Sequence, residues 1–183
     1  MVNYQKFSDT PLAKNVNNAN ALFVEMTNGV VDVHTNGVAN DARGIALGYL
    51  MPLSADSGGL RFHFTDGCTA FDTTSGGSPV TPGSPQSFDI VGSGCAIPSD
   101  AAAVFMTLIA ANPLGAGNFK AVPGGVTPPA AGGGVVNYQD FTPNLTMNNT
   151  NAVVIGLSPT GLIDIHANVS GADTRGITHG YWN

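Results

Sequence analysis

One stretch of the sequence occurs twice, near its start and again at its end. The first copy runs from Asn3 to Tyr49 and the second from Asn137 to Tyr181. Both contain, in the same order, an Asn-x-Asn-Ala segment with an apolar run, a Gly-x-x-Asp-x-His segment and an Asp-x-Arg-Gly-Ile segment. Because polar, turn and apolar positions all match, the repeat constrains the architecture more strongly than any local motif.

The repeat divides the 183 residues into three parts. We call the repeated stretch half B and the segment between its copies half A. Residues 1–50 hold the first half B, residues 51–60 form a connector, and residues 61–183 form a complete module. Within that module, half A spans 61–130 and the second half B spans 135–183. The chain therefore holds one half A for two half B segments.

Short β-branched runs separated by turn residues recur along the chain. Turn signals at roughly 8–12-residue spacing predict an all-β fold, an antiparallel β-sandwich or barrel-like module with a duplicated half. The Thr-Asn-Gly turn at 27–29 predicts a hairpin in the first half B. The Ser-Pro-Thr-Gly turn at 158–161 predicts the equivalent hairpin between 153–157 and 162–166. Half A is expected to form strands at 61–65, 68–73, 86–91 and 118–122.

The longest apolar run, Ala101–Ala111, is compatible with two structures. Ser99 and Asp100 could cap a helix that begins there. The run ends at Asn112-Pro113 and lies among short strands, which favours a central strand buried on both faces.

Two cysteines, Cys68 and Cys95, could form a redox pair, part of a metal site or a structural disulfide. The sequence has no Cys-x-x-Cys spacing, and two thiols alone cannot complete a zinc site. We favour the disulfide, which would stabilise the fold by roughly 3 kcal/mol in the chain-entropy model. A disulfide also indicates an oxidising compartment. No metal and no other cofactor is expected.

The chain carries few charges. Charged residues make up 10% of the sequence, compared with roughly 25% in an average soluble domain. Intracellular proteins usually rely on charge for solubility, so this balance indicates an extracellular, cell-surface or self-assembling protein. A net charge of −6 with six Lys and Arg argues against nucleic-acid binding, which needs clustered cations. No apolar run approaches the ~20 residues of a membrane span, so membrane insertion is not expected.

A series of short motifs runs through residues 62–182 in a fixed order. The motifs are Cys68…Asp72-Thr73, Cys95-Ala96-Ile97-Pro98, Asn112-Pro113, Gly117–Val122, Asn137-Tyr138, Asn151-Ala152-Val153 and Gly180-Tyr181-Trp182. Their order resembles a family of β-rich extracellular modules, found singly or in tandem in secreted proteins of many bacteria. Thr74 stands where the family pattern has Arg. The resemblance implies a secreted, disulfide-linked β module from a family without an established catalytic activity, with residues 3–50 as an extra second half.

The repeated Asp-x-His segments are the candidates for catalysis or metal binding. Asp32 and His34, like Asp164 and His166, share one face of a strand because residues i and i+2 do so. Such a pair could orient a catalytic imidazole or supply metal ligands. A hydrogen-bonded structural pair is favoured, because neither a nucleophile motif nor a third ligand lies nearby. We therefore predict no catalytic residue and no metal site, and a hydrolase is the least favoured function.

The repeated Asp-x-Arg segments also have two interpretations. Asp41 with Arg43, and Asp173 with Arg175, could hold an anion or a sugar through the guanidinium group. A structural salt bridge at a turn before a strand is the favoured interpretation.

The predicted function depends on the first half B. A β half-module without its partner half exposes strand edges and an apolar face, which promote contacts with other chains. The leading hypothesis is a non-enzymatic extracellular structural protein that assembles with itself, head to tail, into a filament or surface layer. The alternative is a carbohydrate-binding or adhesion module that binds glycans through Tyr49, Tyr181 and Trp182.

Overall fold

A computed structural model describes residues 59–128, 136–138 and 149–183. They form eight strands and one short 3-10 helix. The elements are β1 (Phe62–Asp72), β2 (Gln86–Asp89), η1 (Val91–Ser93), β3 (Ala103–Ala111), β4 (Gly117–Pro123), β5 (Val136–Tyr138), β6 (Asn149–Gly156), β7 (Leu162–Asn168) and β8 (Asp173–Trp182). Strands β1–β4 belong to half A and β5–β8 to the second half B. The predictions for residues 1–50 and for most of the connector lie outside the described residues.

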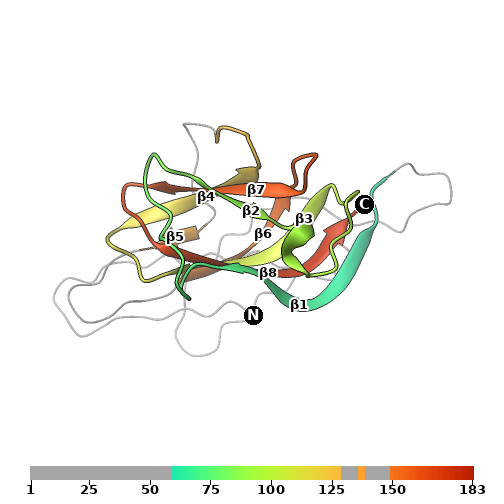
Figure 1. Ribbon diagram of the computed structural model, residues 1–183, viewed down its shortest axis with the longest axis horizontal. Coiled ribbons are helices and arrows are strands. Elements are labelled where there is room, and N and C mark those ends of the chain that lie inside the picture. The colour runs from blue at the N-terminus through green and yellow to red at the C-terminus, as the bar shows by residue number, and fades with distance from the viewer. Residues whose placement is uncertain (1–58, 129–135, 139–148) are drawn as a thin grey trace, which may run out of the picture. The chain divides into compact units, whose positions relative to one another are not determined.

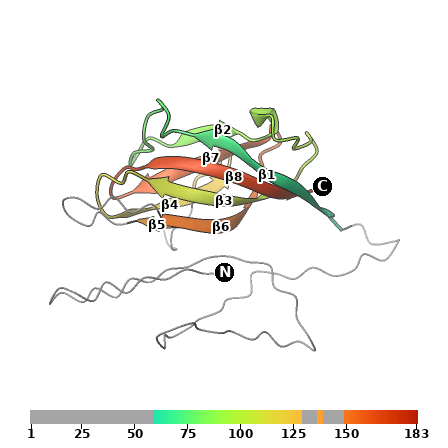
Figure 2. The ribbon, with the colours of Figure 1, turned by 90° about the horizontal axis from the view of Figure 1, so that it is seen from below.

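The strands form two antiparallel sheets, which confirms the predicted all-β sandwich. One sheet has the order β1-β8-β3-β6 and the other β2-β7-β4-β5. Figure 1 shows the sheets as two layers, and Figure 2 shows β1, β8, β3 and β6 following one another across the first sheet. The sheets are not closed into a barrel, so the sandwich alternative is the correct one.

Strands of the two halves alternate in both sheets. Each of the six ladders between the described strands joins one strand of half A to one strand of half B. Strand β8 lies between β1 and β3, and β7 lies between β2 and β4. Within the described ranges, no ladder joins two strands of the same half. Each half therefore obtains its sheet hydrogen bonds from the other half.

The core lies between the two sheets and also draws on both halves. Met106 and Leu108 of β3 are fully buried, as are Ile163 and Ile165 of β7. Inward-facing side chains of two stacked sheets interdigitate in this way in β-sandwiches. Separating the halves would expose apolar surface on both.

The run Ala101–Ala111 is a central strand, as predicted, but it is not equally buried on both faces. Along β3, fully buried residues such as Val104 and Met106 alternate with partly buried ones such as Phe105 and Thr107. In a two-layer sandwich only one face of each sheet packs against the core. The prediction of burial on both faces was therefore wrong. The outward face of β3 also carries apolar residues, so the sequence there does not show which face is buried.

The predicted hairpin around residues 158–161 is not a hairpin. The turn forms, with the Gly161 N–H donating to the Ser158 carbonyl over 2.8 Å. However, β6 pairs with β3 in one sheet, whereas β7 pairs with β2 and β4 in the other. The turn thus joins the two sheets, which lets the apolar faces of β6 and β7 oppose each other across the core. Alternation along each strand does not distinguish this arch from a hairpin.

The two strands predicted at 61–65 and 68–73 are one strand. Strand β1 pairs with β8 along its whole length, with register shifts between Phe64 and Cys68 and between Thr69 and Phe71. Such bulges interrupt the alternation of side chains without ending the strand. Strand β2 stops at Asp89, and the rest of the run predicted at 86–91 enters η1.

Two glycines of β8 make room for aromatic rings of β1. A Cβ atom at Gly176 would overlap the ring of Phe71, and one at Gly180 would overlap the ring of Phe62. The Phe71 ring in turn stacks on Phe88 of the opposite sheet, with ring centroids 3.9 Å apart and planes 17° apart. The glycines therefore allow half A to pack closely on half B.

We expect Gly176→Ala to lower the free energy of unfolding by about 1–3 kcal/mol, because the added methyl group must displace the Phe71 ring. Urea denaturation measures the change. Gly67→Ala is the matched control in β1, since its nearest neighbour atoms lie at 3.6 Å or more. Its effect should stay within about 0.5 kcal/mol. Equal effects of the two substitutions would contradict the packing argument.

The predicted disulfide between Cys68 and Cys95 is present. It joins β1 to the loop that follows η1, with the two Cα atoms 5.6 Å apart. It closes a sequence separation of 27 residues within half A. Since no ladder joins the strands of half A to each other, this bond is a direct covalent restraint within that half.

We expect reduction of this disulfide to lower the free energy of unfolding by roughly 2–5 kcal/mol, the range for small disulfide-bonded domains. The paired variant Cys68→Ser with Cys95→Ser should show the same loss without reductant. Thermal and urea unfolding with and without a phosphine reductant measure both. A reductant effect that persists in the double variant would show that the loss has another origin.

Candidate functional site

Asp164 is buried on the outward face of β7, with 7% of its surface exposed. Its Oδ1 accepts a hydrogen bond from the Ser87 hydroxyl of β2. Its Oδ2 accepts one from the Gly125 N–H, over 2.7 Å, in the turn after β4. Both donors belong to half A. The carboxylate therefore links β7 to β2 and to the turn after β4. Both of its oxygens accept hydrogen bonds within the fold.

His166 lies two residues further along the same face of β7. Its Nε2 is buried and has no hydrogen-bond partner. Asn118 of the neighbouring strand β4 has a buried, unpartnered Oδ1 as well. Asp164 binds Ser87 and Gly125 rather than His166, so the predicted hydrogen-bonded Asp-His pair is not formed in this half B. The first pair, Asp32 and His34, lies outside the described residues.

Arg175 binds half A rather than its predicted partner. Its Nε lies 3.6 Å from Oδ2 of Asp72 in β1, and its Nη2 donates to the Thr69 hydroxyl over 3.1 Å. The carboxylate of Asp173 instead accepts hydrogen bonds from Thr73 and Asn112, over 3.2 and 2.9 Å. The predicted salt bridge between Asp173 and Arg175 is therefore replaced by two separate contacts with half A. Asp41 and Arg43 lie outside the described residues.

Hydrogen bonds lower the pKa of Asp72 below the 3.8 of an unperturbed aspartate. The largest cause is the Thr74 hydroxyl, which donates to Oδ1 over 2.6 Å. The Thr74 N–H and the Arg175 guanidinium act in the same direction, and partial burial opposes them. A lowered pKa in the folded state adds stability above the unfolded pKa, and this stability is lost as the pH falls through the folded value.

We expect Thr74→Ala to raise the pKa of Asp72 and to destabilise the fold at pH 7. The same substitution should cost less at about pH 2, because a lower pH favours the protonated carboxyl group, which the Thr74 hydroxyl does not stabilise in the same way. Carboxyl-detected NMR titration gives the pKa, and urea unfolding at both pH values gives the stability. Thr127→Ala, at an exposed loop position, is the control. An equal loss at the two pH values would contradict this account.

The predicted sugar-binding residues of β8 do not form one surface. The Tyr181 ring stacks on His63, with centroids 4.9 Å apart, whereas Trp182 packs against Phe62, with centroids 4.4 Å apart. Consecutive strand residues point to opposite faces, so the two rings cannot bind the same sugar. Arg175 lies six residues before Tyr181, or roughly 20 Å along an extended strand. Tyr49 lies outside the described residues.

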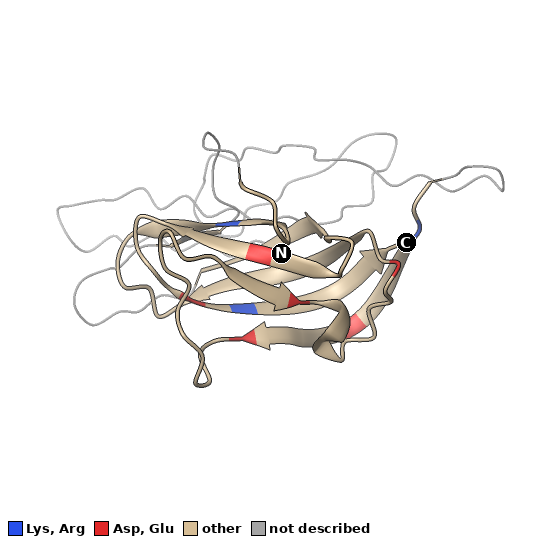
Figure 3. Ribbon diagram, turned by 45° about the horizontal axis from the view of Figure 1, so that its top comes forward, with Lys and Arg blue, Asp and Glu red and all other residues tan. Residues whose placement is uncertain are grey.

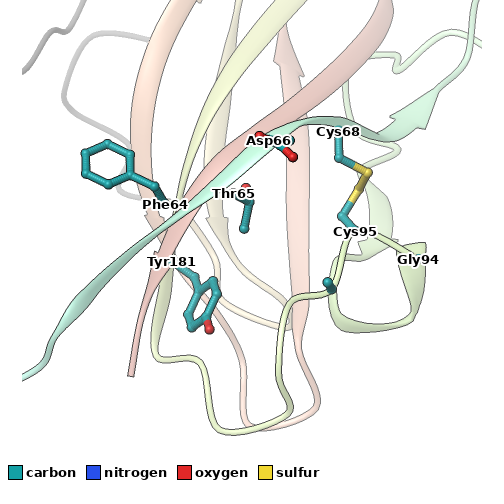
Figure 4. A pocket seen from close by; sticks show the side chains of 8 residues that line it. Phe64, Thr65, Asp66, Cys68, Gly94, Cys95 and Tyr181 are labelled. Atoms are coloured by element: carbon teal, nitrogen blue, oxygen red, sulfur yellow. A yellow bond between two sulfur atoms is a disulfide. The ribbon is translucent and has the colours of Figure 1, made fainter.

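A shallow, open pocket of about 460 Å³ lies beside the disulfide at the first bulge of β1. Figure 4 shows Phe64 projecting outward from β1, with Thr65 between Tyr181 and the disulfide. Phe64 is 81% exposed, and the Thr65 hydroxyl is buried without a partner. Sequence reasoning missed this pocket, because it depends on a bulge that the alternating residues at 61–65 do not reveal. The pocket offers aromatic and hydroxyl groups but no catalytic combination of side chains.

Charged residues of the described part of the chain are few and dispersed, as Figure 3 shows. Within the described ranges, no group of three or more His, Cys, Asp or Glu side chains is placed to hold a metal ion. The same residues include no helix with the length and apolar character of a membrane span.

Comparison with known proteins assigns neither a family nor a function to this chain. No protein-family model matches the sequence, and no curated protein matches it significantly. The fold and the contacts described above are therefore the basis for proposing a function.

Proposed function

We propose that this protein is a non-enzymatic extracellular structural protein that assembles with itself into a filament or surface layer. Residues 1–50 would make the contacts between subunits. The observation that carries the proposal is the alternation of halves, since β5–β8 form all their described ladders with β1–β4. The first copy of half B matches the second in its polar, turn and apolar positions, so it would offer the same kind of strands and apolar faces to a neighbouring chain.

The outer face of the first sheet supplies a second surface that suits assembly. On the edge strand β1, Phe62 lies 4.7 Å from Phe64 and 4.4 Å from Trp182 between ring centroids. Phe64 is 81% exposed, and Val154 of the opposite edge strand is 52% exposed. Exposed aromatic groups on an edge strand favour lateral contacts between molecules.

The chemistry of the chain fits an extracellular location. The disulfide would persist in an oxidising compartment. A charged content of 10% leaves a weakly repelling surface, which assists close packing of subunits. Each of the repeated polar residues Asp164, Asp173 and Arg175 contacts half A, which supports a structural role for them.

We expect the full chain to form filaments or large assemblies and residues 51–183 to remain monomeric. The shorter chain contains all eight described strands, so it should keep the fold. Light scattering and negative-stain electron microscopy at matched concentrations measure the assembly, and circular dichroism verifies the fold of the shorter chain. If both chains are compact monomers, the assembly function is wrong.

The pocket beside Tyr181 favours one alternative, a carbohydrate-binding or adhesion module. Tyr181 and the exposed Phe64 offer aromatic groups, and Thr65 and Asp66 offer polar ones. A glycan array with the monomeric chain would detect such binding, and Tyr181→Ala should abolish it. Absence of binding would leave the structural function as the better account.

A further inference from the structure

A bulge in β1 brings two consecutive residues to one pocket. Residues 65–67 lie opposite the single residue His179 of β8, so the strand departs from regular pairing here. Consecutive residues of a regular strand point to opposite faces, whereas a bulge redirects side chains locally. Thr65 and Asp66 both line the pocket of about 460 Å³ beside the disulfide, where Figure 4 labels them. The bulge therefore gives this pocket two adjacent polar residues.

The Thr65 hydroxyl is buried and unsatisfied. Its Oγ1 has no hydrogen-bond partner among the described residues. Leaving a buried hydroxyl unpaired lowers stability, so a group of this kind calls for an explanation. Because Oγ1 is buried, other atoms of Thr65 line the pocket. One rotation about χ1 moves the hydroxyl to the position of the methyl group, so a bound molecule can supply the missing partner.

A second wall of the pocket is strained. Ala96, which follows Cys95, has a φ of 55°, in the left-handed region that favours glycine. Gly94, on the other side of Cys95, has a φ of 81°. Strained residues cluster at ligand-binding sites, where the surrounding structure holds them in place. Phe64 also lines the pocket, and 81% of its surface is exposed.

Charge indicates what the pocket binds. Asp66 is the one charged side chain among the eight lining residues, and it is exposed. Within the described residues, the single ion pair joins Arg175 to Asp72, so no basic side chain there neutralises Asp66. The net charge of −6 adds a general attraction for cations. Complementarity of charge therefore favours a ligand with a positively charged group.

The remaining lining groups suit an ammonium group on an apolar chain. A primary ammonium group donates three hydrogen bonds and accepts none, and both a carboxylate and a hydroxyl can accept them. The Tyr181 ring is held by stacking on His63, with centroids 4.9 Å apart. An aromatic ring attracts a cation electrostatically. A neutral sugar gains less from an unpaired carboxylate, because hydrogen bonds between two charged groups are stronger than those to one.

We propose that this pocket binds a small molecule that carries a primary ammonium group on a short apolar chain. The ammonium group donates to the carboxylate of Asp66 and to the hydroxyl of Thr65, and the chain packs on the ring of Tyr181. This inference goes beyond the proposed function and does not depend on assembly, since all the residues that it uses belong to the described module.

Pentylamine is the probe, and pentanol is its uncharged counterpart. We expect pentylamine to bind the full chain with a Kd of about 1 mM, which is reasonable for so small a ligand. Pentanol should bind at least about fivefold more weakly. Saturation-transfer difference NMR measures both, because it detects weak binding to monomers and to large assemblies alike. A tripeptide with a central lysine presents the same group on a polypeptide. If it binds more tightly than pentylamine, the assignment to a small molecule is overturned.

Two matched variants test the role of the charge. Asp66→Asn should weaken pentylamine binding about three- to fivefold, because it removes the charge and keeps the shape of the side chain. Asp100→Asn is the control, since Asp100 is another exposed aspartate and does not line the pocket. Its effect should stay below about 1.5-fold, because solvent and salt screen charges that do not contact the ligand.

Thr65→Val separates binding from a structural role of the hydroxyl. It should weaken pentylamine binding about two- to fivefold, because one acceptor is lost. It should also raise the midpoint of urea unfolding of the unliganded protein, because an unsatisfied buried group is removed. A lower midpoint with unchanged binding would show that the hydroxyl is structural and would overturn its place in the site.

Failure of this inference differs from failure of the proposed function. The inference is overturned if pentylamine and pentanol bind equally, or if Asp66→Asn and Asp100→Asn have equal effects, whether or not the chain assembles. If glucose binds and pentylamine does not, the inference is overturned in favour of the carbohydrate-binding alternative. If a monomeric full chain binds pentylamine and Asp66→Asn weakens that binding, the inference stands and the assembly function is wrong.

Discussion

The alternation of strands from the two halves is the constraint on which the rest of this structure depends. Strands β7 and β8 each lie between two strands of half A, so their N–H and C=O groups are satisfied only when half A is present. The core has the same dependence, because Met106 from one half packs in the same cluster as Ile163 from the other. Hydrogen bonding and apolar burial therefore form together, between segments far apart in the sequence. Such non-local pairing makes the two halves one cooperative unit rather than two subdomains.

The surfaces through which the halves meet are complementary in shape and in hydrogen bonding as well as in hydrophobicity. Backbone at Gly176 and Gly180 approaches aromatic rings of β1 at distances that any side chain would prevent. Buried Asp164 is tolerated because two donors of half A satisfy its oxygens. These contacts make a half B specific for a half A, since an unmatched sheet would leave a buried carboxylate unpaired and rings without space.

The sequence predicted the strands well and their partners poorly. Alternation of apolar residues located most of the strands, and the two cysteines correctly indicated a disulfide. Periodicity describes the two faces of a strand but not the strand that lies beside it, so it predicts a hairpin at 158–161 where the chain forms an arch between the sheets. The same limit applied to the candidate site. Asp173 and Arg175 are neighbours in sequence, yet each binds half A, roughly 60 to 100 residues away along the chain.

Repeated polar residues invite a chemical interpretation, and the contacts of the second copy explain why a structural one is better. A catalytic carboxylate needs an oxygen available to substrate, whereas Asp164 uses both oxygens to hold β2 and the turn after β4. The guanidinium group of Arg175 lies against Asp72 and Thr69 of β1, so these contacts hold half B to half A. Each of these residues lies where the two halves join. The joining of half B to half A therefore explains where these residues stand in the second copy.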